Sequence, residues 1–370
     1  MDYDIAVIGG GIQGAGVAQA AAAEGYSVIV MEQTALASGT SSKSSKLIHG
    51  GLRYLETGQF KLVRKTILER EKLIALFPDL VKPIKFYIPI YKETVRKAWQ
   101  IRIGLFLYQI LGGFKKYTRF MSVSLKKNPF EFLRTKNLKA MFQYYDAQTD
   151  DALLTKRVMQ LAEELGAHLM CPAKVMGLSF NGLGYDIAIE NNPEKVKVKF
   201  VINVAGPWVN RVLETVSGIA VDKKPCDFVQ GTHILIDTEA PDGIIYVEAP
   251  QDKRAVFIMP WKGKTLVGTT EQNYSGDPAD VAPSKEEISY LKEVYSHYMR
   301  LDEVNIIGSF AGLRVLPKST GSFFSRPRDT FICHSADNLM TLYGGKLTGY
   351  RVTAKQVLKQ VTSIFKEKGL

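Results

Sequence analysis

Residues 4–32 read DIAVIGGGIQGAGVAQAAAAEGYSVIVME, and this stretch decides the fold. Its apolar run at 4–8 is typical of a buried parallel strand, and its alanine-rich run at 15–24 is typical of a tightly packed helix. A second apolar run, 27–31, ends at an acidic residue. Strand, glycine turn, helix, strand and acid follow one another in the order of a dinucleotide-binding unit.

The glycine motif of this stretch has a mechanical reason at each position. Gly9 permits the tight turn, Gly11 lets a pyrophosphate approach the backbone, and Gly14 lets the helix lie close to the strand. The free N–H groups at the helix N-terminus favour phosphate. Glu32, eighteen residues after Gly14, can accept hydrogen bonds from a ribose diol. The motif alone does not distinguish FAD from NAD.

The length and composition are those of a globular protein. A chain of 370 residues allows two domains or one large composite domain. Because the first strand begins at residue 3, we expect no signal peptide. Cys171, Cys226 and Cys333 are far apart and in no metal-binding spacing, so we expect a reducing cytoplasm and neither a disulfide framework nor a metal site.

The positive charge is concentrated in one segment. Residues 92–139 hold twelve Lys or Arg against two Glu, so they carry +10 of the net charge of +11. Within this segment the apolar run 98–111 is interrupted by Arg102 and is too short to span a bilayer. Interleaved aromatic residues favour a helix lying at an anionic membrane interface, and a core helix beside a basic loop is the alternative. We expect no nucleic-acid partner, because no nucleic-acid-binding motif accompanies the basic residues.

Residues 41–56 read SSKSSKLIHGGLRYLE. By composition this is either a loop of small hydroxyl donors that wraps a polar ligand or a serine-rich surface loop. The run resembles the hallmark of FAD-dependent glycerol-3-phosphate dehydrogenases, which belong to the D-amino-acid-oxidase-like flavoprotein superfamily. The resemblance continues, in the same order, through residues 99–112, 205–209 (AGPWV), 231–234 (GTHI), 258–261 (IMPW), 267–270 (VGTT), 312–314 (GLR) and 344–351 (GGKLTGYR).

The resemblance implies an α/β fold of mixed α+β character. A Rossmann-like FAD-binding domain with an inserted β-meander would be joined to a substrate domain with a largely antiparallel sheet. The FAD-binding domain would comprise residues 1–75, 148–221 and 312–370, and the substrate domain residues 76–147 and 222–311, with 92–139 as a basic, membrane-facing segment.

The local patterns suggest where the elements of these domains lie. Strand-like runs at 168–176, 185–190 and 195–204 favour FAD, because a simple NAD-dependent dehydrogenase would continue with βαβ units. Four further runs alternate as antiparallel strands, at 229–235, 243–249, 255–260 and 265–270. Helices are expected at 59–80, 152–165 after Asp150, 284–300 with a Ser284–Glu287 capping box, and from Gly344-Gly345-Lys346 to 358.

The resemblance also implies that distant residues meet at the flavin. The cofactor-binding residues would be Gly9, Gly11, Gly14, Glu32, Gln33, Thr40, Ser41, Ser42, Ser45, Lys46, Leu47, Val175, Ala205, Gly206, Trp208, Gly345, Lys346, Leu347 and Thr348. The catalytic residues would be His233, Arg314, Arg53, His49, Lys346 and Tyr54.

Oxidation of a secondary alcohol on a flavin needs a base, a carbinol hydrogen held over flavin N5, and cations for a phosphate. Our hypothesis makes His233 the base and places Arg53 and Arg314 on the substrate phosphate or alkoxide. Lys346 would lie near flavin N1/O2 or the substrate. A covalent flavin link through His49, as some relatives in the superfamily have, is the less favoured alternative.

The implied activity is oxidation of sn-glycerol-3-phosphate to dihydroxyacetone phosphate, with electrons passed to a membrane quinone or another acceptor. We expect a cytoplasmic protein, peripheral at the inner face of the cytoplasmic membrane on an anionic surface, and self-association into a homo-oligomer. The alternatives are an oxidoreductase of the same superfamily that acts on an amine or 2-hydroxy acid, and a non-catalytic flavin-binding paralogue.

Two departures from the family pattern leave these alternatives open. Val315-Leu316-Pro317 follows Arg314 in an order unlike the family's, so the substrate specificity could have changed. The further C-terminal helical domain that the resemblance implies does not follow the helix at residue 344.

Overall fold

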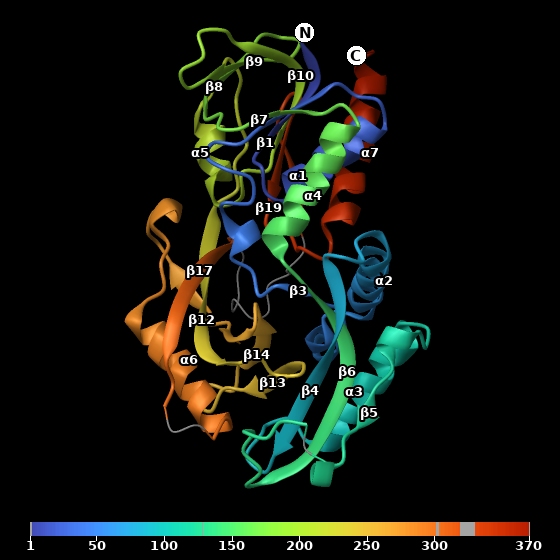
Figure 1. The fold of residues 1–370 in the computed structure, drawn as a ribbon. Coiled ribbons are helices and arrows are strands. Elements are labelled where there is room, and N and C mark those ends of the chain that lie inside the picture. Colours follow the sequence, from blue (N-terminus) through green and yellow to red (C-terminus); the bar gives the residue numbers. More distant parts are fainter. Residues whose placement is uncertain (1, 128, 301–302, 319–329, 370) are drawn as a thin grey trace.

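The computed structural model describes residues 2–127, 129–300, 303–318 and 330–369. Its strands form two large sheets that lie one above the other along the long axis of the molecule (Figure 1). We call them the nucleotide sheet, which contains β1, and the substrate sheet, which contains β12. The first and last described residues lie near each other at the end of the molecule that holds the nucleotide sheet.

The nucleotide sheet has a parallel centre with the strand order β7-β2-β1-β10-β19. These five strands are β1 (Tyr3–Ile8), β2 (Val28–Met31), β7 (His168–Met170), β10 (Val196–Asn203) and β19 (Leu339–Tyr343). The flanking strands are β8 (Val175–Phe180), β9 (Tyr185–Ile189), β11 (Val216–Ser217) and β18 (Phe331–Ala336). β8, β9 and β10 pair antiparallel in succession, which confirms the inserted β-meander.

Three helices cover one face of the nucleotide sheet (Figure 1): α1 (Ile12–Ala23), α4 (Asp151–Glu164) and α7 (Tyr350–Lys368). Ile5 and Val7 of β1 belong to the core beneath these helices, whereas Ala6 and Ile8 face the meander and α5 (Val209–Glu214). A strand that is apolar on both faces is what a doubly covered parallel sheet requires. The continuous apolar run at residues 4–8 reflects this requirement.

The substrate sheet is mostly antiparallel, as predicted; β4 and β13 pair in parallel. Its strands are β3 (Leu47–Ile48), β4 (Val81–Tyr91), β5 (Met121–Ser122), β6 (Leu138–Thr149), β12 (Cys226–Glu239), β13 (Ile244–Glu248), β14 (Ala255–Trp261), β15 (Lys264–Gly268), β16 (Gln272–Tyr274) and β17 (Ile306–Pro317). Helix α6 (Lys285–Tyr298) packs on one face, and α2 (Phe60–Leu76) and α3 (Ala98–Leu111) pack beside β4 and β6. The predicted Ser284–Glu287 capping box is present at the start of α6.

Several predicted boundaries are wrong. The last helix continues to Lys368, past its expected end at 358, and β12 extends beyond the expected 229–235 at both ends. Three other differences have a local reason. The last helix begins at Tyr350 because Gly344 and Gly345 have φ angles of 73° and 120°, outside the helical region. The expected strand at 168–176 is divided into β7 and β8 around Pro172. Helix α2 ends at Leu76, two residues before Pro78, because a residue before proline avoids the helical conformation. The domain boundaries themselves stay a prediction.

Candidate active site

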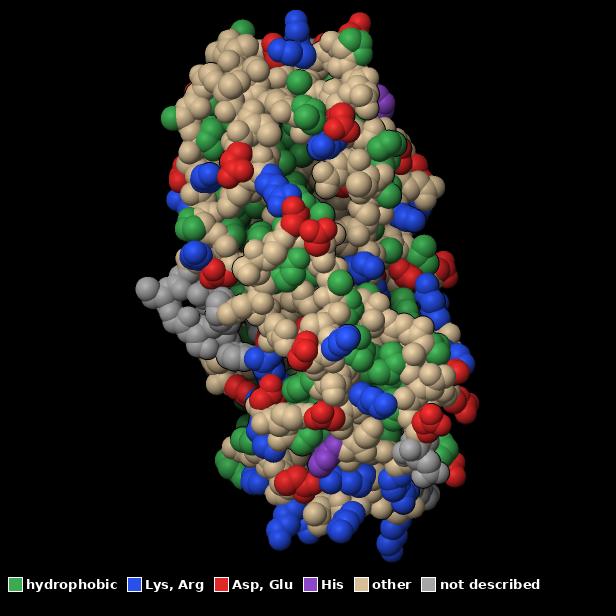
Figure 2. Space-filling model, turned by 90° about the vertical axis from the view of Figure 1, so that its left-hand side faces the viewer, with side chains coloured by type: hydrophobic (Ala, Val, Ile, Leu, Met, Phe, Trp, Pro, Cys, Tyr) green, Lys and Arg blue, Asp and Glu red, His purple; other side chains and the backbone are tan. Residues whose placement is uncertain are grey.

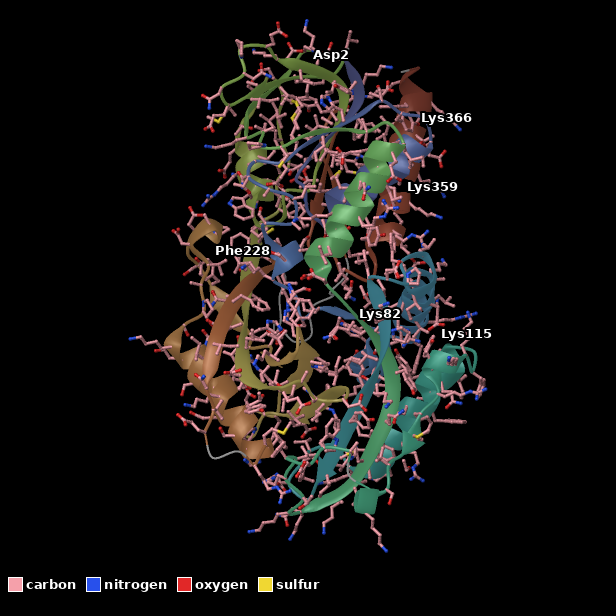
Figure 3. All side chains as sticks on the ribbon, in the orientation of Figure 1. Asp2, Lys82, Lys115, Phe228, Lys359 and Lys366 are labelled. Atoms are coloured by element: carbon pink, nitrogen blue, oxygen red, sulfur yellow. The ribbon has the colours of Figure 1, made fainter. Side chains whose placement is uncertain are left out.

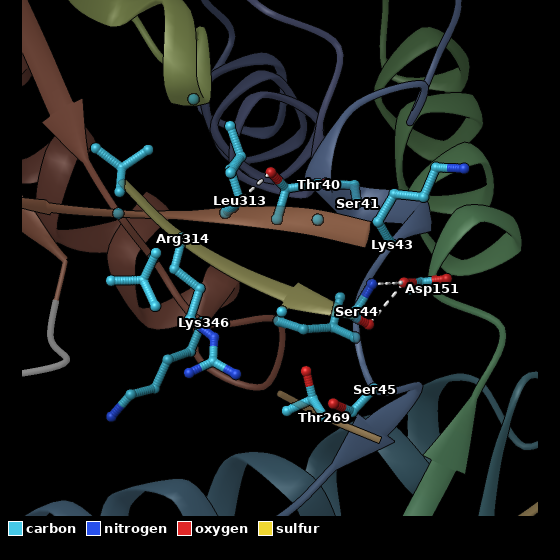
Figure 4. A pocket seen from close by; sticks show the side chains of 18 of the residues that line it. Thr40, Ser41, Lys43, Ser44, Ser45, Asp151, Thr269, Leu313, Arg314 and Lys346 are labelled. Carbon is cyan, nitrogen blue, oxygen red and sulfur yellow. Dashed lines mark hydrogen bonds between the residues drawn. The ribbon is translucent and has the colours of Figure 1, made fainter. Parts of the chain in front are cut away.

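A cavity of about 1830 Å³ lies between the two sheets and is lined by residues of both. Figure 4 shows part of its wall: the hydroxyl loop at residues 40–45, Thr269, Arg314 and Lys346. Segments far apart in the chain therefore meet at one place.

The glycine turn forms one end of the cavity. A Cβ atom on Gly14 would lie 1.9 Å from the carbonyl oxygen of Gly9, so only glycine allows α1 to start this close to β1. The Glu32 carboxylate accepts hydrogen bonds from the amides of Gly10 (2.7 Å) and Thr34 (3.0 Å). Ser41 Oγ accepts from the amide of Ile12 (2.9 Å) in the first turn of α1. These contacts hold the turn, the acid and the loop together around the helix N-terminus.

The hydroxyl loop is fixed to the substrate sheet and to helix α4, which covers the nucleotide sheet. Thr40 Oγ1 donates to the carbonyl of Leu313 on β17 (2.9 Å), and the amide and hydroxyl of Ser44 donate to Asp151 at the start of α4 (Figure 4). Lys46 donates to the same Asp151 (2.7 Å) and to the carbonyl of Ser42 (2.6 Å). The Lys46 amino group is thus part of the loop's support.

Most of the predicted cofactor residues line the cavity. They are Gly9, Gly11, Glu32, Gln33, Thr40, Ser41, Ser45, Leu47, Val175, Ala205, Gly206, Trp208, Gly345, Lys346, Leu347 and Thr348. Gly14, Ser42 and Lys46 are not among the lining residues. Their contacts lie within the turn and the loop support described above.

His233 is buried in the cavity wall with 2% of its surface exposed. Its Nε2 is 3.0 Å from Ser45 Oγ, and its ring stacks on Phe310, with ring centroids 4.9 Å apart. Among the described residues no polar group bonds to its Nδ1. Burial, with the positive charges of Lys46 and Arg314, lowers the pKa of His233 to about 3. The imidazole is therefore neutral at physiological pH.

The register of β12 and β17 explains this grouping. His233 lies opposite Phe310, Gly231 opposite Gly312, and Val229 opposite Arg314. Directly opposite residues of an antiparallel pair point to the same face. This alternation directs His233 and Arg314 into the cavity, whereas Ile234 joins the core under α6.

The predicted cations and their neighbours line the same cavity. Arg314 is ion-paired with Glu271, and Lys346 Nζ lies 4.5 Å from the ring centroid of Tyr54. Arg53 is half-buried on the short 3₁₀ helix at residues 52–57, and the amide of His49 donates to Thr348 Oγ1 (3.3 Å). All six predicted catalytic residues therefore meet at this cavity.

Sequence reasoning missed three groups of lining residues. Glu271 follows the VGTT motif directly, so its position could have been found as the polar residue that ends a motif. Asp146 and Thr66 carry no local signal, because their partners are distant in the chain. The cavity also extends to an apolar wall formed by Leu52, Phe86, Ile88, Ile101, Ile103 and Leu107.

The observed cradle fits an extended dinucleotide. Beyond the glycine turn, Gly206 has a φ of 55°, and a Cβ added there would meet no atom within 4 Å. The chain turns again at Gly344 and Gly345, which also have positive φ and line the cavity. Three glycine-rich turns with a helix N-terminus and an acid at one end supply the backbone donors and the acceptor that a flavin dinucleotide needs.

Comparison with known proteins identifies the family. A family model described as FAD dependent oxidoreductase matches residues 4–351. The chain is 38% identical to a glycerol-3-phosphate dehydrogenase of Pseudomonas aeruginosa, over 99% of this chain and 73% of that protein. It is 35% identical to a D-erythritol 1-phosphate dehydrogenase of Brucella abortus, over 99% of this chain and 75% of that protein.

A solved structure agrees with this assignment. The glycerol-3-phosphate dehydrogenase from Bacillus halodurans, complexed with FAD, superposes with a TM-score of 0.75 at 28% identity. The match covers 98% of this chain and 64% of that one. The resemblance first indicated by residues 41–56 is thereby confirmed, and the chain belongs to the family of FAD-dependent oxidoreductases with FAD as its cofactor.

Proposed function

We propose that the protein oxidises sn-glycerol-3-phosphate to dihydroxyacetone phosphate. The observation that carries the proposal is that a neutral, buried histidine lines the cavity that begins at the glycine turn, together with Arg53, Arg314 and Lys346. His233 supplies the proton acceptor, and Arg53, Arg314 and Lys346 supply positive charge. The names of the relatives at 38% and 28% identity support the same activity.

His233 is suited to take the hydroxyl proton of the substrate. Its low pKa keeps the imidazole neutral, and its neighbour Phe310 fixes the ring plane. A substrate phosphate bound at Arg314 would offset part of the positive charge that lowers this pKa and so make the imidazole a stronger base. Ser45, which bonds to Nε2, holds the ring in place and lies on the loop at the cofactor end of the cavity. When bound, FAD supplies the acceptor for the carbinol hydrogen and its electron pair.

Two arginines are suited to the phosphate. A guanidinium group presents a planar fork of donors that matches phosphate oxygens, and each charge-assisted contact stabilises binding by about 1.5–3 kcal/mol. Arg314 lies on β17 and is held by Glu271, whereas Arg53 lies on the 3₁₀ helix that follows β3, so the two cations approach the cavity from different elements. Lys346, over the Tyr54 ring, lies at the third turn of the cradle.

A second candidate substrate is D-erythritol 1-phosphate. The relative from Brucella abortus, at 35% identity, carries that activity in its name. Both compounds pair a phosphate with a secondary alcohol, and the same histidine and arginines would serve either one. The longer polyol would need extra hydroxyl partners, so relative kcat/KM distinguishes the two.

Steady-state kinetics of the FAD-loaded protein with an artificial dye test this function. We expect turnover with glycerol-3-phosphate and a kcat/KM at least about 100-fold lower with glycerol, which lacks the phosphate. Erythritol 1-phosphate, glycine, sarcosine and 2-hydroxyglutarate are measured in parallel. Equal rates with glycerol, or turnover confined to an amine or 2-hydroxy acid, would refute the proposal.

We further propose that the protein docks on an anionic membrane surface. Helix α3 supports this, because Trp99, Ile103, Phe106 and Ile110 recur at helical spacing and are all exposed, Trp99 by 64%. The opposite side of α3, Ile101 and Leu105, is buried. An apolar stripe on the outside of a helix is the pattern of an interfacial helix. Among the described residues, no helix is long and apolar enough to cross a bilayer.

Exposed cations lie near this stripe. Lys115 and Lys116 follow α3, and Figure 3 shows Lys115 at the outer edge of the molecule. Figure 2 shows further Lys and Arg side chains gathered at the end of the molecule that lies opposite the nucleotide sheet. Arg96 and Arg134 of the same segment are paired with Glu56, Glu248 and Glu93 instead. The exposed cations suit anionic headgroups.

We propose a membrane quinone as the electron acceptor. The apolar wall of the cavity supports this, since Ile101, Ile103 and Leu107 of α3 contribute to it. The helix with the exposed stripe therefore also borders the cavity. An apolar acceptor dissolved in the bilayer would meet apolar side chains along this route.

A further inference from the structure

A buried hydrogen-bond network lies beneath the loop that carries His49, Arg53 and Tyr54. Its centre is Asp146 on β6, which is 1% exposed. One carboxylate oxygen, Oδ1, accepts from Arg70 Nη1 (2.6 Å), from the Tyr108 hydroxyl (2.7 Å) and from the amide of Gly50 (3.0 Å). The network thus joins α2, α3 and β6 to Gly50, in the loop that carries His49, Arg53 and Tyr54.

Gly50 is held from two sides. Its amide donates to Asp146, and its carbonyl accepts from Thr66 Oγ1 on α2 at 2.7 Å. A Cβ at Gly50 would lie 2.2 Å from the Tyr108 hydroxyl and 2.6 Å from Ile67 Cγ1. Helices α2 and α3 therefore pack directly against the backbone at Gly50 and restrict its movement.

The residues on both sides of Gly50 line the cavity. His49 precedes it, and its own amide donates to Thr348 Oγ1 (3.3 Å). Gly51 follows with a φ of 75° and starts the 3₁₀ turn that presents Arg53 and Tyr54. Because only Gly51 separates the fixed residue from this turn, the position of Gly50 sets the directions of His49 and of the turn.

The charge of Asp146 makes this anchor stiff. Arg70 is fully buried and also donates to the carbonyls of Tyr145 (2.9 Å) and Tyr117 (2.8 Å). Arg70 is also ion-paired with Glu71 (2.7 Å), so loss of the Asp146 charge leaves this buried arginine with one of its two carboxylate partners, and the surrounding groups must then rearrange. The carboxylate therefore fixes the amide of Gly50 more firmly than a neutral acceptor would.

We propose that Asp146 is a positioning residue of the active site, which acts on the substrate through the Gly50 peptide and the side chains of His49, Arg53 and Tyr54. The inference rests on the proposed function, in which these side chains contact the substrate. Thr66 and Tyr108 have supporting parts in the same role. A displacement of about 1 Å at reacting groups lowers rates by roughly 100-fold in other enzymes, so small shifts of this loop matter.

The test uses the FAD-loaded protein and the variants Asp146→Asn, Tyr108→Phe and Thr66→Val. Tyr295→Phe is the matched control, because Tyr295 is a buried tyrosine whose hydroxyl bonds to Thr238 (3.1 Å) away from the cavity. Two quantities are measured: the anaerobic rate of flavin reduction at saturating glycerol-3-phosphate, and hydrogen–deuterium exchange of the peptide covering 47–58. FAD content and Tm are recorded for each protein.

We expect Asp146→Asn to retain FAD, to exchange faster at 47–58 and to reduce its flavin at least about tenfold more slowly. Thr66→Val and Tyr108→Phe should show smaller changes of the same kind. Tyr295→Phe should match the wild type in its reduction rate and in its exchange at 47–58. In the other three variants, exchange of the peptide at 285–298 should match that of the wild type. If Asp146→Asn does not fold, the other two variants decide the outcome.

Unchanged exchange at 47–58 in every variant that folds would overturn the proposal. So would a loss of FAD or Tm with an unchanged reduction rate in the FAD-loaded fraction, because that is the signature of a purely structural role. A wild-type flavin that glycerol-3-phosphate does not reduce would refute the proposed function instead. The exchange measurement would then still decide whether Asp146 fixes Gly50.

Discussion

Burial and neighbouring charges act together on His233. In the unfolded chain a histidine has its usual pKa of about 6.5, whereas the folded protein lowers the pKa of His233 to about 3. Between these values the unfolded state binds more protons, so this group makes the folded state less stable as the pH falls from about 6.5 towards 3.

Replacement of His233 by Asn should remove this acid sensitivity. We expect the free energy of unfolding of the wild type to fall more steeply below pH 6.5 than that of the variant, by at most about 1.4 kcal/mol per pH unit. Urea unfolding at pH 7.0, 6.0 and 5.0, with FAD at fixed excess, measures the difference. Parallel pH dependences of the two proteins would contradict the low pKa.

Arg314 offers a second prediction at this scale. Arg314→Lys keeps the positive charge but loses the planar fork of donors that suits a phosphate and the Glu271 carboxylate. We expect kcat/KM for glycerol-3-phosphate to fall roughly 10- to 100-fold, or about 1.4–3 kcal/mol, with FAD content unchanged. Steady-state assays measure this change. A wild-type kcat/KM in this variant would mean that Arg314 does not bind the substrate phosphate.

Single residues could be predicted from the sequence where a motif carries them. Gly9 and Gly11 of the glycine turn and the residues flanking Gly50 were found in this way, and they line the cavity. The partners of these residues could not be found, because Asp146 and Gly50 are 96 positions apart and nothing local relates them. Lys46 shows the same limit, since its partner Asp151 is 105 positions away.

At the scale of elements, α1 depends on the contact between Gly14 and Gly9. In Gly14→Ala, the new Cβ would lie 1.9 Å from a backbone oxygen that cannot move without breaking the turn. We expect a loss of about 1–3 kcal/mol in stability and weaker FAD binding. Chemical unfolding and FAD titration measure both.

Gly104→Ala is the matched control for this variant. Gly104 lies within α3, its φ is not positive, and a Cβ there would meet no atom within 4 Å. We expect it to be neutral or to stabilise by about 0.5–1 kcal/mol, because alanine is the better helix former. Equal effects of the two substitutions would contradict the close-approach explanation of Gly14.

Helix α3 is the element that the membrane proposal depends on. We expect the protein to float with vesicles that contain anionic lipid and to be released by high salt, because screening weakens the attraction of the exposed cations. Combined replacement of Trp99, Ile103 and Phe106 by Ser should reduce flotation at least about tenfold, as should neutralisation of Lys115, Lys116 and Arg119.

Leu183→Ser serves as the control for flotation. Leu183 is 67% exposed in the turn between β8 and β9, away from α3. Its replacement removes a comparable exposed apolar side chain, so this variant should float as the wild type does. If the α3 variants float as the wild type does, the docking proposal is contradicted.

Elements with a strong periodic pattern agreed with the prediction, whereas the end of α2, the strand around Pro172 and the start of α7 did not. The bounds of α3 and the capping box of α6 match. The start of α7 was misplaced, because the sequence does not show whether Gly344 and Gly345 take a helical or a positive φ. A capping side chain has a local signature, whereas a glycine turn is decided by the backbone that surrounds it.

At the scale of the whole molecule, the two sheets meet at one cavity, to which both contribute. Helical and strand periodicity predict a parallel unit and an antiparallel unit but do not say how they face each other. Their juxtaposition brings the glycine turn at residues 9–14 to the same cavity as His233 and Arg314. It could be expected only from the family resemblance.

The most direct test of the central claim is the visible spectrum of the purified, FAD-loaded protein under nitrogen, with and without glycerol-3-phosphate. We predict that glycerol-3-phosphate bleaches the flavin band almost completely. One equivalent of dihydroxyacetone phosphate should form for each flavin reduced. An intact flavin band after prolonged incubation with glycerol-3-phosphate, in a protein that dithionite still reduces, would contradict it.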